Sequence, residues 1–480
     1  MCPWRLTAKV MNKDRIKDFF NGIAPERDAW RKLNSYYHDD IKGFLRFLIP
    51  AGCSVLDVGC ATGETTAWLA KDNPDIRGID FSPAMIAEGL RKYPGLDLKV
   101  EDAETLPLGE RSYDYIVISD LVGYLDDVQI FLSSLRERSH PKTKLVITTY
   151  NYLWEPLLVL AERLKLKMPN PMQNWLSDSD IENLLYLAGF EVVKSGGRLL
   201  LPKNIPVLAP ICNRYLAKLP FLRGLCLTKY FIARPRPAAK ISASVSVLIP
   251  ARNEKGNIES AVKRVPKMGS HTEIIFVEGN STDDTWSEIE RVKAAYPQMD
   301  IKIIKQDGKG KGDAVRKGFD AASCDILMIL DADLTVRPED LPRFYEAMVS
   351  GSAEFINGCR LVYQMEDQAM RLLNVFGNKF FSLMFSWLLE QRIKDTLCGT
   401  KVLWRSDYER IKANRKFFGD FDPFGDFDLL FGASKLNLKI IDLPIRYQAR
   451  VYGETNISRF KHGWLLLRMC FFAMKKIKFI

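Results

Sequence analysis

The sequence predicts an α/β fold in two domains, each built around a largely parallel sheet. A chain of 480 residues is longer than one ordinary hydrophobic core can organise, so two domains are expected. Its hydrophobic content of 47% and charged content of 27% are typical of a globular protein. In two separate stretches, short apolar runs alternate with amphipathic segments, which is the pattern of strands joined by helices.

The first stretch predicts a sheet in the N-terminal half. A later piece of this half, LSDSDIENLLYLAGFEVVKSG at 176–196, predicts a capped helix followed by a strand. The expected strands before it are the apolar runs at 54–59, 76–81, 96–102, 113–120 and 144–150.

The second stretch predicts another sheet in the C-terminal half. Between its strands we expect helices such as 257–265, where the apolar residues recur on one face. The expected strands are the runs at 244–254, 272–280, 300–308 and 325–333.

The segment ARPRPAAKISAS, residues 233–244, separates the two stretches. It is rich in proline, alanine, serine and basic residues, a composition typical of linkers. We therefore predict one domain over 1–235, a linker over 236–243 and a second domain over 244–480. The two halves do not resemble each other, so two different activities are expected.

Net charge and cysteine usage limit the partners and the compartment. The net charge of +10 indicates an anionic partner, such as acidic lipid or a phosphorylated ligand, or else a generally basic surface. No nucleic-acid-binding module is recognisable, so nucleic acid is not an expected partner. Nine cysteines without regular spacing indicate reduced thiols. With no signal peptide and no apolar run of about 20 residues, we expect a cytoplasmic protein.

The segment VLDVGCATGETTAWLA, from residue 55, predicts a strand, a glycine-bearing turn and the start of a helix. Gly59 and Gly63 allow a tight turn and a close approach of a ligand to the backbone. Asp57 ends the strand, where it can orient the loop or accept a hydrogen bond from a ligand amine. Asp80 ends the next strand, where an acid can bind two ribose hydroxyls, and Asp102 follows the third strand.

This ordered series resembles class I S-adenosylmethionine-dependent methyltransferases over residues 15–235. G-C-A-T-G is not a dinucleotide-binding pattern, so NAD is a minor alternative. The methyl acceptor is not readable: Ser119, Asp120 and Tyr124 lie where such enzymes meet their substrate, although ordinary packing is slightly favoured for Tyr124. By this resemblance S-adenosylmethionine would be lined by Asp57, Gly59, Gly63, Asp80, Asp102 and Ala103.

Two carboxylates one residue apart, Asp331 and Asp333, end the apolar run LMIL in the C-terminal half. If they lie on a strand, alternation places both on the same side. Carboxylates together with phosphate oxygens suit Mg²⁺ or Mn²⁺, which would neutralise a leaving diphosphate. A solvated pair of loop acids is the alternative.

The surrounding motifs resemble family-2 glycosyltransferases of the GT-A fold over residues 243–460. The motifs are VLIPARNE, VEGNSTDDT, GKGKGDAVRKG, DADL, NGCR and DTLCGTKVLWR, and their order is most similar to that of dolichyl- or polyprenyl-phosphate sugar synthases. That family usually has VDDGS where this chain has Glu278-Gly279-Asn280-Ser281, which leaves UDP or GDP open. The resemblance implies a metal at Asp331 and Asp333 and substrate contacts from Pro250, Asn253, Glu254, Glu278, Lys311, Asp331, Arg360, Arg371 and Arg450.

The resemblance also implies inversion at the anomeric carbon and leaves the acceptor open between a lipid phosphate and a glycan. A hydroxyl acceptor needs a general base, for which Asp395 and Asp426 are candidates; Asp333 would act through the metal. A lipid phosphate is already ionised and needs only cations around it. The arginines favour the lipid phosphate.

Two segments of the C-terminal half are candidates for membrane contact. Residues 374–393 are aromatic-rich, and the tail 457–480 mixes apolar residues with cations. Neither is long enough to span a bilayer, so we expect peripheral contact with the inner face of the membrane. Core helices, or a dimer contact in a homo-oligomer, are the alternatives.

The sequence therefore predicts a bifunctional enzyme, with methyltransferase and glycosyltransferase activities in one chain. An alternative is a glycosyltransferase acting on a saccharide, with an S-adenosylmethionine-binding domain that only regulates it. A protein whose sites are all vestigial is a third interpretation.

Overall fold

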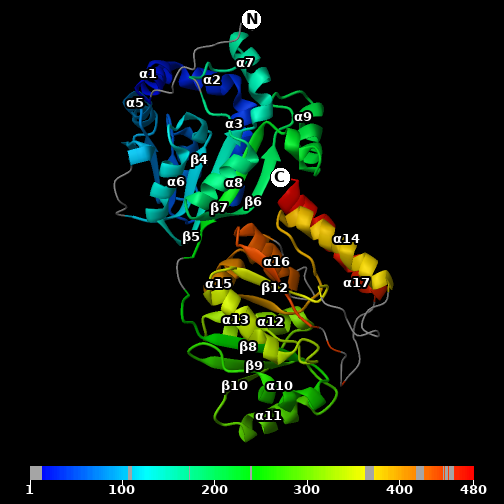
Figure 1. The fold of residues 1–480 in the computed structure, drawn as a ribbon. Helices are drawn as coiled ribbons and strands as arrows, with labels where there is room; N and C mark the ends of the chain where they lie inside the picture. The colour runs from blue at the N-terminus through cyan, green and yellow to red at the C-terminus, as the bar shows by residue number, and fades with distance from the viewer. Residues whose placement is uncertain are drawn as a thin grey trace, which may run out of the picture. The chain divides into compact units, whose positions relative to one another are not determined.

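The computed structural model describes residues 13–105, 111–171, 173–237, 240–362, 372–417, 426–446, 448, 452 and 459–479. The chain forms two compact units, Met1–Arg236 and Pro237–Ile480. Each unit contains a mixed sheet of seven strands with helices packed on it (Figure 1). The α/β class predicted from the alternating runs is thus confirmed in both halves.

In the N-terminal half the strand order is β3-β2-β1-β4-β5-β7-β6. Strands β1 to β5 are parallel, whereas β7 runs antiparallel between β5 and β6. The elements are α1 (Lys13–Ile23), α2 (Arg27–Leu33), α3 (Ser35–Leu48), β1 (Val55–Val58), α4 (Glu64–Ala70), β2 (Ile76–Asp80), α5 (Pro83–Lys92), β3 (Asp97–Val100), β4 (Tyr113–Ser119), α6 (Val128–Glu137), β5 (Ser139–Tyr150), α7 (Glu155–Arg163), α8 (Asp178–Leu187), β6 (Phe190–Arg198), α9 (Leu208–Pro210) and β7 (Thr228–Pro235).

The local sequence explains the main features of this half. All four residues of β1 are buried, as expected for a strand with neighbours on both edges and helices on both faces. Helix α8 begins with a capping box in which Ser177 and Asp180 each accept the other's backbone N–H. Strand β7 was not predicted, and its last three residues, Ala233–Pro235, belong to the buried sheet although the sequence places them in a linker-like segment.

In the C-terminal half the strand order is β10-β9-β8-β11-β13-β12-β14. Strands β8 to β11 are parallel, and β13 runs antiparallel to both its neighbours, β11 and β12. The elements are β8 (Val245–Ala251), α10 (Ile258–Arg264), β9 (Thr272–Glu278), α11 (Thr285–Ala295), β10 (Asp300–Lys305), α12 (Lys311–Ala321), β11 (Ile326–Ile329), α13 (Leu341–Val349), β12 (Phe355–Cys359), α14 (Leu372–Leu389), β13 (Lys401–Trp404), α15 (Arg405–Ala413), α16 (Asp426–Lys435), β14 (Ile440–Pro444) and α17 (Arg459–Ala473).

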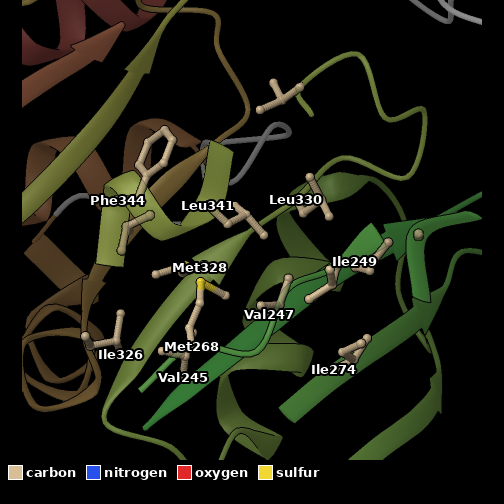
Figure 2. Packing of buried hydrophobic residues seen from close by; sticks show 14 of the residues in the cluster. Val245, Val247, Ile249, Met268, Ile274, Ile326, Met328, Leu330, Leu341 and Phe344 are labelled. Carbon is tan, nitrogen blue, oxygen red and sulfur yellow. The ribbon is translucent and has the colours of Figure 1, made fainter. Parts of the chain in front are cut away.

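One face of this second sheet packs against α10, α11 and α13. Figure 2 shows Val245, Val247 and Ile249 of β8 beside Met328 of β11, with Phe344 of α13 in the same cluster. These side chains are spaced two residues apart along β8, so they point to one face of the sheet. The alternate residue Leu248 faces the opposite layer, together with residues of α12 and α14.

Helices α14 and α17 are in part core helices, as one of the alternatives for the aromatic-rich segments expected. Phe385 and Leu388 of α14 are buried in a cluster that also contains Met469 of α17. Figure 1 shows the two helices running beside each other. Among the described residues, no helix is both long and apolar enough to cross a bilayer.

The close packing of α12 on β8 predicts a stability effect. A Cβ added at Gly318 in α12 would overlap Cδ1 of Leu248, which is fully buried. We expect Gly318→Ala to lower the free energy of unfolding of the C-terminal half by about 1–3 kcal/mol, because overpacking displaces core side chains. Denaturant unfolding of the full chain measures this.

Gly377→Ala in α14 is the matched control for this change. No atom lies within 4 Å of a Cβ at Gly377, so alanine only improves helix propensity. We expect an unchanged or slightly higher stability. Equal destabilisation by both substitutions would contradict the packing of α12 on β8.

Candidate functional site

In the N-terminal half, Asp57 lies in β1, next to the last residue of the strand. Its Oδ2 accepts a hydrogen bond from Oγ1 of Thr66 in α4 at 2.7 Å. The side chain is buried, and burial raises the pKa of Asp57 to about 6. The carboxylate is therefore tied to the helix that follows the glycine-bearing loop, and it is sensitive to any charge placed beside it.

The loop after β1 contains the two glycines that the sequence singled out. Gly59 and Gly63 have φ values of 76° and 72°, in the left-handed region that favours glycine. A Cβ on Gly63 would lie 2.9 Å from Cδ1 of Leu98, and one on Gly59 would lie 3.1 Å from Cδ1 of Leu121. Backbone conformation and neighbouring side chains thus account for both glycines without invoking a ligand.

Asp80 at the end of β2 connects two loops. Its Oδ2 accepts a hydrogen bond from the Ala61 N–H and its Oδ1 accepts one from the Ser82 N–H, each at 2.9 Å. Burial raises the pKa of Asp80, and these two bonds partly oppose that rise. Because a carboxylate oxygen can accept more than one hydrogen bond, Asp80 can hold the loops and still bind a ligand hydroxyl.

Asp102 and Ala103 follow β3. The Asp102 carboxylate lies 2.6 Å from Nζ of Lys13 in α1, and it also accepts a hydrogen bond from the Glu104 N–H. Ala103 begins a short 3₁₀ turn, Ala103–Thr105. The sequence did not predict the contact with Lys13, which comes from a helix far upstream of the strand motifs.

A cavity of about 370 Å³ collects most of these residues. Asp57, Gly59, Asp80, Asp102 and Ala103 all line it, whereas Gly63 lies in the same loop outside the lining. The cavity therefore occupies the carboxyl ends of β1, β2 and β3, where an α/β sheet that reverses its strand order forms a crevice.

One end of the cavity is lined by residues that sequence reasoning missed. Tyr37 donates a hydrogen bond from its hydroxyl to Oδ2 of Asp120 at 2.6 Å. Burial, together with the nearby charges of Arg31 and Arg27, lowers the pKa of His38 to about 2, so the ring is neutral at physiological pH. Nε of Arg27 is buried and has no hydrogen-bond partner within the described part of the chain.

These residues come from α2, α3 and the end of β5, and no local motif marks them. Their only signal was amphipathic helical spacing, which does not distinguish a cavity wall from ordinary packing. Tyr124 and Tyr150 also line the cavity, and burial raises the pKa of both phenols. A buried guanidinium and aromatic walls provide for a ligand with both an anionic and an apolar part.

In the C-terminal half, polar residues follow β8 and β9. Asn253 accepts a hydrogen bond at Oδ1 from the Thr282 N–H at 2.8 Å. Glu254 is buried and accepts a hydrogen bond at Oε2 from Nδ2 of Asn257, and Glu278 is buried with Oε1 bound by the Ser281 N–H. The loops after the two strands are thus connected to each other.

Two further residues belong to the same edge of the sheet. Pro250 lies near the end of β8 and is paired in register with Val277 of β9. Gln306, which the sequence did not single out, follows β10; its N–H donates to Glu278 O at 2.9 Å and its Nε2 donates to Gly310 O at 2.7 Å. The glycine- and lysine-containing loop is therefore held beside the end of β9.

Asp331 and Asp333 lie in a turn after β11, because the strand ends at Ile329. The prediction that strand alternation places both carboxylates on one side is therefore wrong, because neither residue lies on a strand. Asp331 pairs with Nζ of Lys311 at 2.6 Å, and Asp333 accepts hydrogen bonds from the N–H and Oγ1 of Thr335. Desolvation alone would raise the pKa of Asp331, but the charge and hydrogen bond of Lys311, together with the charges of Lys401 and Arg360, outweigh it and lower the pKa.

Gly399 lies against this pair. A Cβ at Gly399 would overlap both Oδ2 of Asp331 and Nζ of Lys311, so only glycine leaves room for them. Within the described residues, no group of three or more His, Cys, Asp or Glu side chains is arranged to hold a metal ion. Two carboxylates with substrate phosphates are nevertheless a usual ligand set for Mg²⁺.

Asp395 and Arg360 are paired with each other. Nε and the guanidinium Nη2 of Arg360 donate to the two oxygens of Asp395 at 2.8 and 2.9 Å, and the N–H groups of Arg360 and Leu397 donate to them as well. Burial would raise the pKa of Asp395, but Arg360 and these bonds outweigh it and lower the pKa. Such a carboxylate is a poor general base.

The remaining predicted residues are only partly described. Arg371 and Arg450 lie outside the described residues. Asp426 is the first residue of α16, and its side chain also lies outside them. Its neighbour Asp428 forms an ion pair with Arg415 at 2.9 Å.

Both halves match known protein families. Residues 29–195 match the family described as Methyltransferase domain, and residues 246–412 match Glycosyl transferase family 2. The chain joins a methyltransferase domain to a family 2 glycosyl transferase domain.

Three known proteins illustrate these likenesses. A dolichol-phosphate mannosyltransferase of Pyrococcus furiosus is 38% identical over 221 residues, which are 45% of this chain and 59% of that protein. The chain thus spans about three fifths of that relative. A possible histamine N-methyltransferase of Thermotoga maritima has 16% identity over 46% of this chain and 100% of its own, with a TM-score of 0.37. The glucosyl-3-phosphoglycerate synthase of Mycobacterium tuberculosis has 19% identity over 49% and 80%, with a TM-score of 0.36.

The pairing of Asp395 with Arg360 predicts that Asp395 contributes mainly to stability. Asp395→Asn removes the fully buried charge that pairs with Arg360, so we expect the free energy of unfolding of this domain to fall by about 3–5 kcal/mol. Denaturant unfolding measures the loss. Asp284→Asn, at an exposed ion pair with Lys255, is the control and should change stability by less than about 1 kcal/mol.

An Asp395→Asn protein of unchanged stability that has lost sugar transfer would contradict this prediction. It would identify Asp395 as a catalytic base instead.

Proposed function

We propose that this protein is a bifunctional enzyme. Its N-terminal domain transfers a methyl group from S-adenosylmethionine. Its C-terminal domain transfers a sugar, with inversion, from a nucleotide-sugar to a polyprenyl-phosphate-type lipid. The support for the second activity is the 38% identity to a dolichol-phosphate mannosyltransferase over 221 residues, together with the acids and Lys311 at the ends of β8, β9 and β11.

The cavity of the methyltransferase domain has the groups that the methyl donor requires. The donor's cationic amine and sulfonium suit a place beside Asp57, and its ribose hydroxyls suit Asp80. Its carboxylate, or an anionic group of the acceptor, suits the guanidinium of Arg27. Methyl transfer needs chiefly alignment of the acceptor with the methyl group, so a neutral His38 and the Tyr37–Asp120 pair can act by positioning alone.

In the glycosyltransferase domain, Asp331 and Asp333 are the residues that would hold Mg²⁺ or Mn²⁺. The bound cation would stabilise the charge on the leaving nucleoside diphosphate. Lys311 places a second positive charge at the same turn. Glu254, Glu278 and Asn253 form the adjoining edge where the nucleotide would bind.

The state of Asp395 is the observation that favours a phosphate acceptor. A hydroxyl acceptor needs a base, and the pKa of Asp395 is lowered by its pairing with Arg360. A lipid phosphate is already ionised and attacks the anomeric carbon without losing a proton. A glycan acceptor is the alternative and would require a base elsewhere in the domain.

A lipid acceptor requires contact with a membrane. On α14 and α17 the side chains of Leu383, Trp464 and Phe471 are each 65% exposed, although other faces of these helices belong to the core. Arg468 and Lys475 are exposed on or next to α17. An exposed apolar face with cations beside it supports peripheral binding to an anionic bilayer surface.

We expect Asp333→Ala to lower sugar transfer by about 100-fold or more, because it removes one of two ligands for the cation. Binding of S-adenosylmethionine, measured by calorimetry on the same protein, should not change. The assay combines the full chain, membranes, a divalent cation and a panel of nucleotide-sugars, with mass spectrometry of lipid and glycan products. Undiminished sugar transfer by Asp333→Ala would refute the assigned cation site.

The panel also tests the two activities separately. A methylated product formed only with S-adenosylmethionine supports the bifunctional enzyme. Donor binding without methylation of any lipid or glycan would support a regulatory role for the N-terminal domain.

The raised pKa of Asp57 predicts the pH dependence of donor binding. Below about pH 6 the free protein protonates Asp57, whereas the cationic donor favours the ionised carboxylate. Affinity for S-adenosylmethionine should therefore fall as the pH drops below 6, approaching tenfold per pH unit. Calorimetric titrations between pH 5 and 8 measure it.

Asp57→Asn should bind more weakly and lose most of this pH response, since asparagine can still accept the Thr66 bond but does not ionise. Asp120→Asn, at a carboxylate near the other end of the cavity, should retain the response. Equal pH dependence in the wild type and Asp57→Asn would assign the titration to another group.

A further inference from the structure

The methyltransferase domain exposes a large apolar surface between β6 and β7. This segment, residues 203–227, forms short helical turns, including α9 and the turns Ile211–Tyr215, Leu216–Lys218 and Arg223–Leu225. Phe221 is 77% and Val207 is 73% exposed, more than any other large apolar side chain in the described residues. The exposed members are Ile205, Val207, Leu208, Ile211, Tyr215, Leu216, Phe221 and Leu225.

Specific hydrogen bonds hold this segment in place. The Leu201 N–H donates to Oδ1 of Asn213 at 2.9 Å, and Nδ2 of Asn213 donates to Leu201 O at 2.7 Å. Nδ2 of Asn151 donates to Gly224 O and to Cys226 O, each at 2.8 Å. The apolar side chains are thus presented from a fixed backbone.

The exposed face of α7 continues this surface. Nε1 of Trp154, just before α7, donates to Leu225 O at 2.8 Å, so the two segments are in contact (Figure 1). We call the combined area the 152–225 surface. From α7 and its flanks it includes Tyr152, Leu153, Leu157, Val159, Leu160, Leu164 and Leu166.

The charge around this surface favours anionic lipid as the partner. The chain has no Asp or Glu between Glu191 and Glu254. Lys203 and Arg214 are exposed within the apolar segment, and Arg163 and Lys165 are exposed at the end of α7, which also contains Glu155 and Glu162. Contiguous apolar side chains with cations among them match the interface of an anionic bilayer, where each cation near the surface adds to the attraction.

The same segments line the cavity that contains the methyl-donor residues. Pro202, Lys203 and Leu227 line it from the 203–227 side, and Leu158 and Ala161 line it from α7. Asp57 and Asp80 line the other part of this one cavity. A molecule held in a bilayer against the 152–225 surface would therefore be next to the cavity's wall.

We propose that the 152–225 surface binds an anionic lipid bilayer and that the methyl acceptor is a bilayer-held molecule entering the adjoining cavity. The identity of the acceptor rests on the proposed methyltransferase function, whereas the docking does not. This surface consists of residues of the methyltransferase domain, whereas α14 and α17 belong to the C-terminal half. A bilayer contact on the methyltransferase domain itself would bring its substrate to the cavity without release into water.

Vesicle flotation of the full chain tests the docking. With phosphatidylcholine vesicles containing about 30% phosphatidylglycerol, we expect Val207→Ser/Phe221→Ser to bind at least about tenfold more weakly than the wild type, since two exposed apolar side chains no longer insert. The control is Ile130→Ser/Leu187→Ser, at 58% and 52% exposed positions on α6 and α8, which should bind like the wild type. Equal binding by all three proteins overturns the proposal.

Hydrogen exchange identifies which surface is covered. We expect amides of 203–227 and α7 to become protected when anionic vesicles are added, and to lose this protection in Val207→Ser/Phe221→Ser. Protection confined to α14 and α17 would overturn the proposal. A different result is possible without vesicles: residues 203–227 are already protected, and the variant has a changed oligomeric state. This would show that a second copy of the chain covers the surface. If 203–227 is protected without vesicles and the variant has the oligomeric state of the wild type, the other domain of the same chain covers the surface. That result also overturns bilayer docking.

A third measurement tests whether the methyl acceptor is held in the bilayer, and it distinguishes failure of that proposal from failure of the methyltransferase function. The wild type is incubated with methyl-labelled S-adenosylmethionine and vesicles of bacterial or archaeal polar lipids, and the label should enter the organic phase. Val207→Ser/Phe221→Ser should transfer at least about tenfold less label to that phase. The variant should still bind the donor normally. Label that enters only a water-soluble acceptor, at equal rates in both proteins, refutes a bilayer-held acceptor. A protein that binds no donor refutes the methyltransferase function and leaves the docking result standing.

Discussion

The reversal of strand order beside β1 and beside β8 determines where chemistry can occur in this chain. The strand order of each sheet reverses at that point, which is where loops after neighbouring parallel strands diverge in α/β folds, and in the N-terminal half the cavity lies there. Buried carboxylates at the strand ends then organise the loops. Asp80 joins the loops after β1 and β2 through two backbone amides, and Lys311 joins α12 to the turn after β11 through Asp331. The two halves therefore share this topological arrangement at their candidate sites.

The aspartates at these sites have pKa values shifted in different directions. The direction depends on whether desolvation or the partner of the carboxylate has the larger effect. Asp57 is buried with a hydroxyl as its partner, so desolvation prevails and its pKa rises. Asp395 is also buried and Asp331 is half-buried, but Arg360 lowers the pKa of Asp395, and Lys311 with neighbouring cations lowers the pKa of Asp331. A raised pKa leaves Asp57 responsive to a cationic ligand, while the lowered ones keep the other two ionised.

Much of the parallel core could be predicted because its signals are local. Strands β1, β2, β8, β9 and β11 are short apolar runs with an acid at or after the end, and both features stand within a few residues of sequence. Strands β7, β12, β13 and β14 were not predicted, because each is placed by partners distant in the chain. The pairing of Arg360 with Asp395 was not predicted for a similar reason: the two residues are 35 positions apart, and only the fold brings them together. The cavity residues of α2 and α3, among them Arg27 and His38, precede every recognisable motif.

If both domains bind a bilayer as proposed, the bilayer couples them by holding their acceptors in one plane. Nine residues separate the end of β7 at Pro235 from the start of β8 at Val245, which is about 30 Å of extended chain. Within that reach, apolar faces on both domains could rest on one membrane, each presenting its own site to lipids that diffuse in the same plane. Confining a lipid-linked product to two dimensions beside the second domain raises its local concentration, as tethering does for any linked pair of sites. A fusion of this kind needs no channel between its cavities, because the bilayer itself would carry the intermediate.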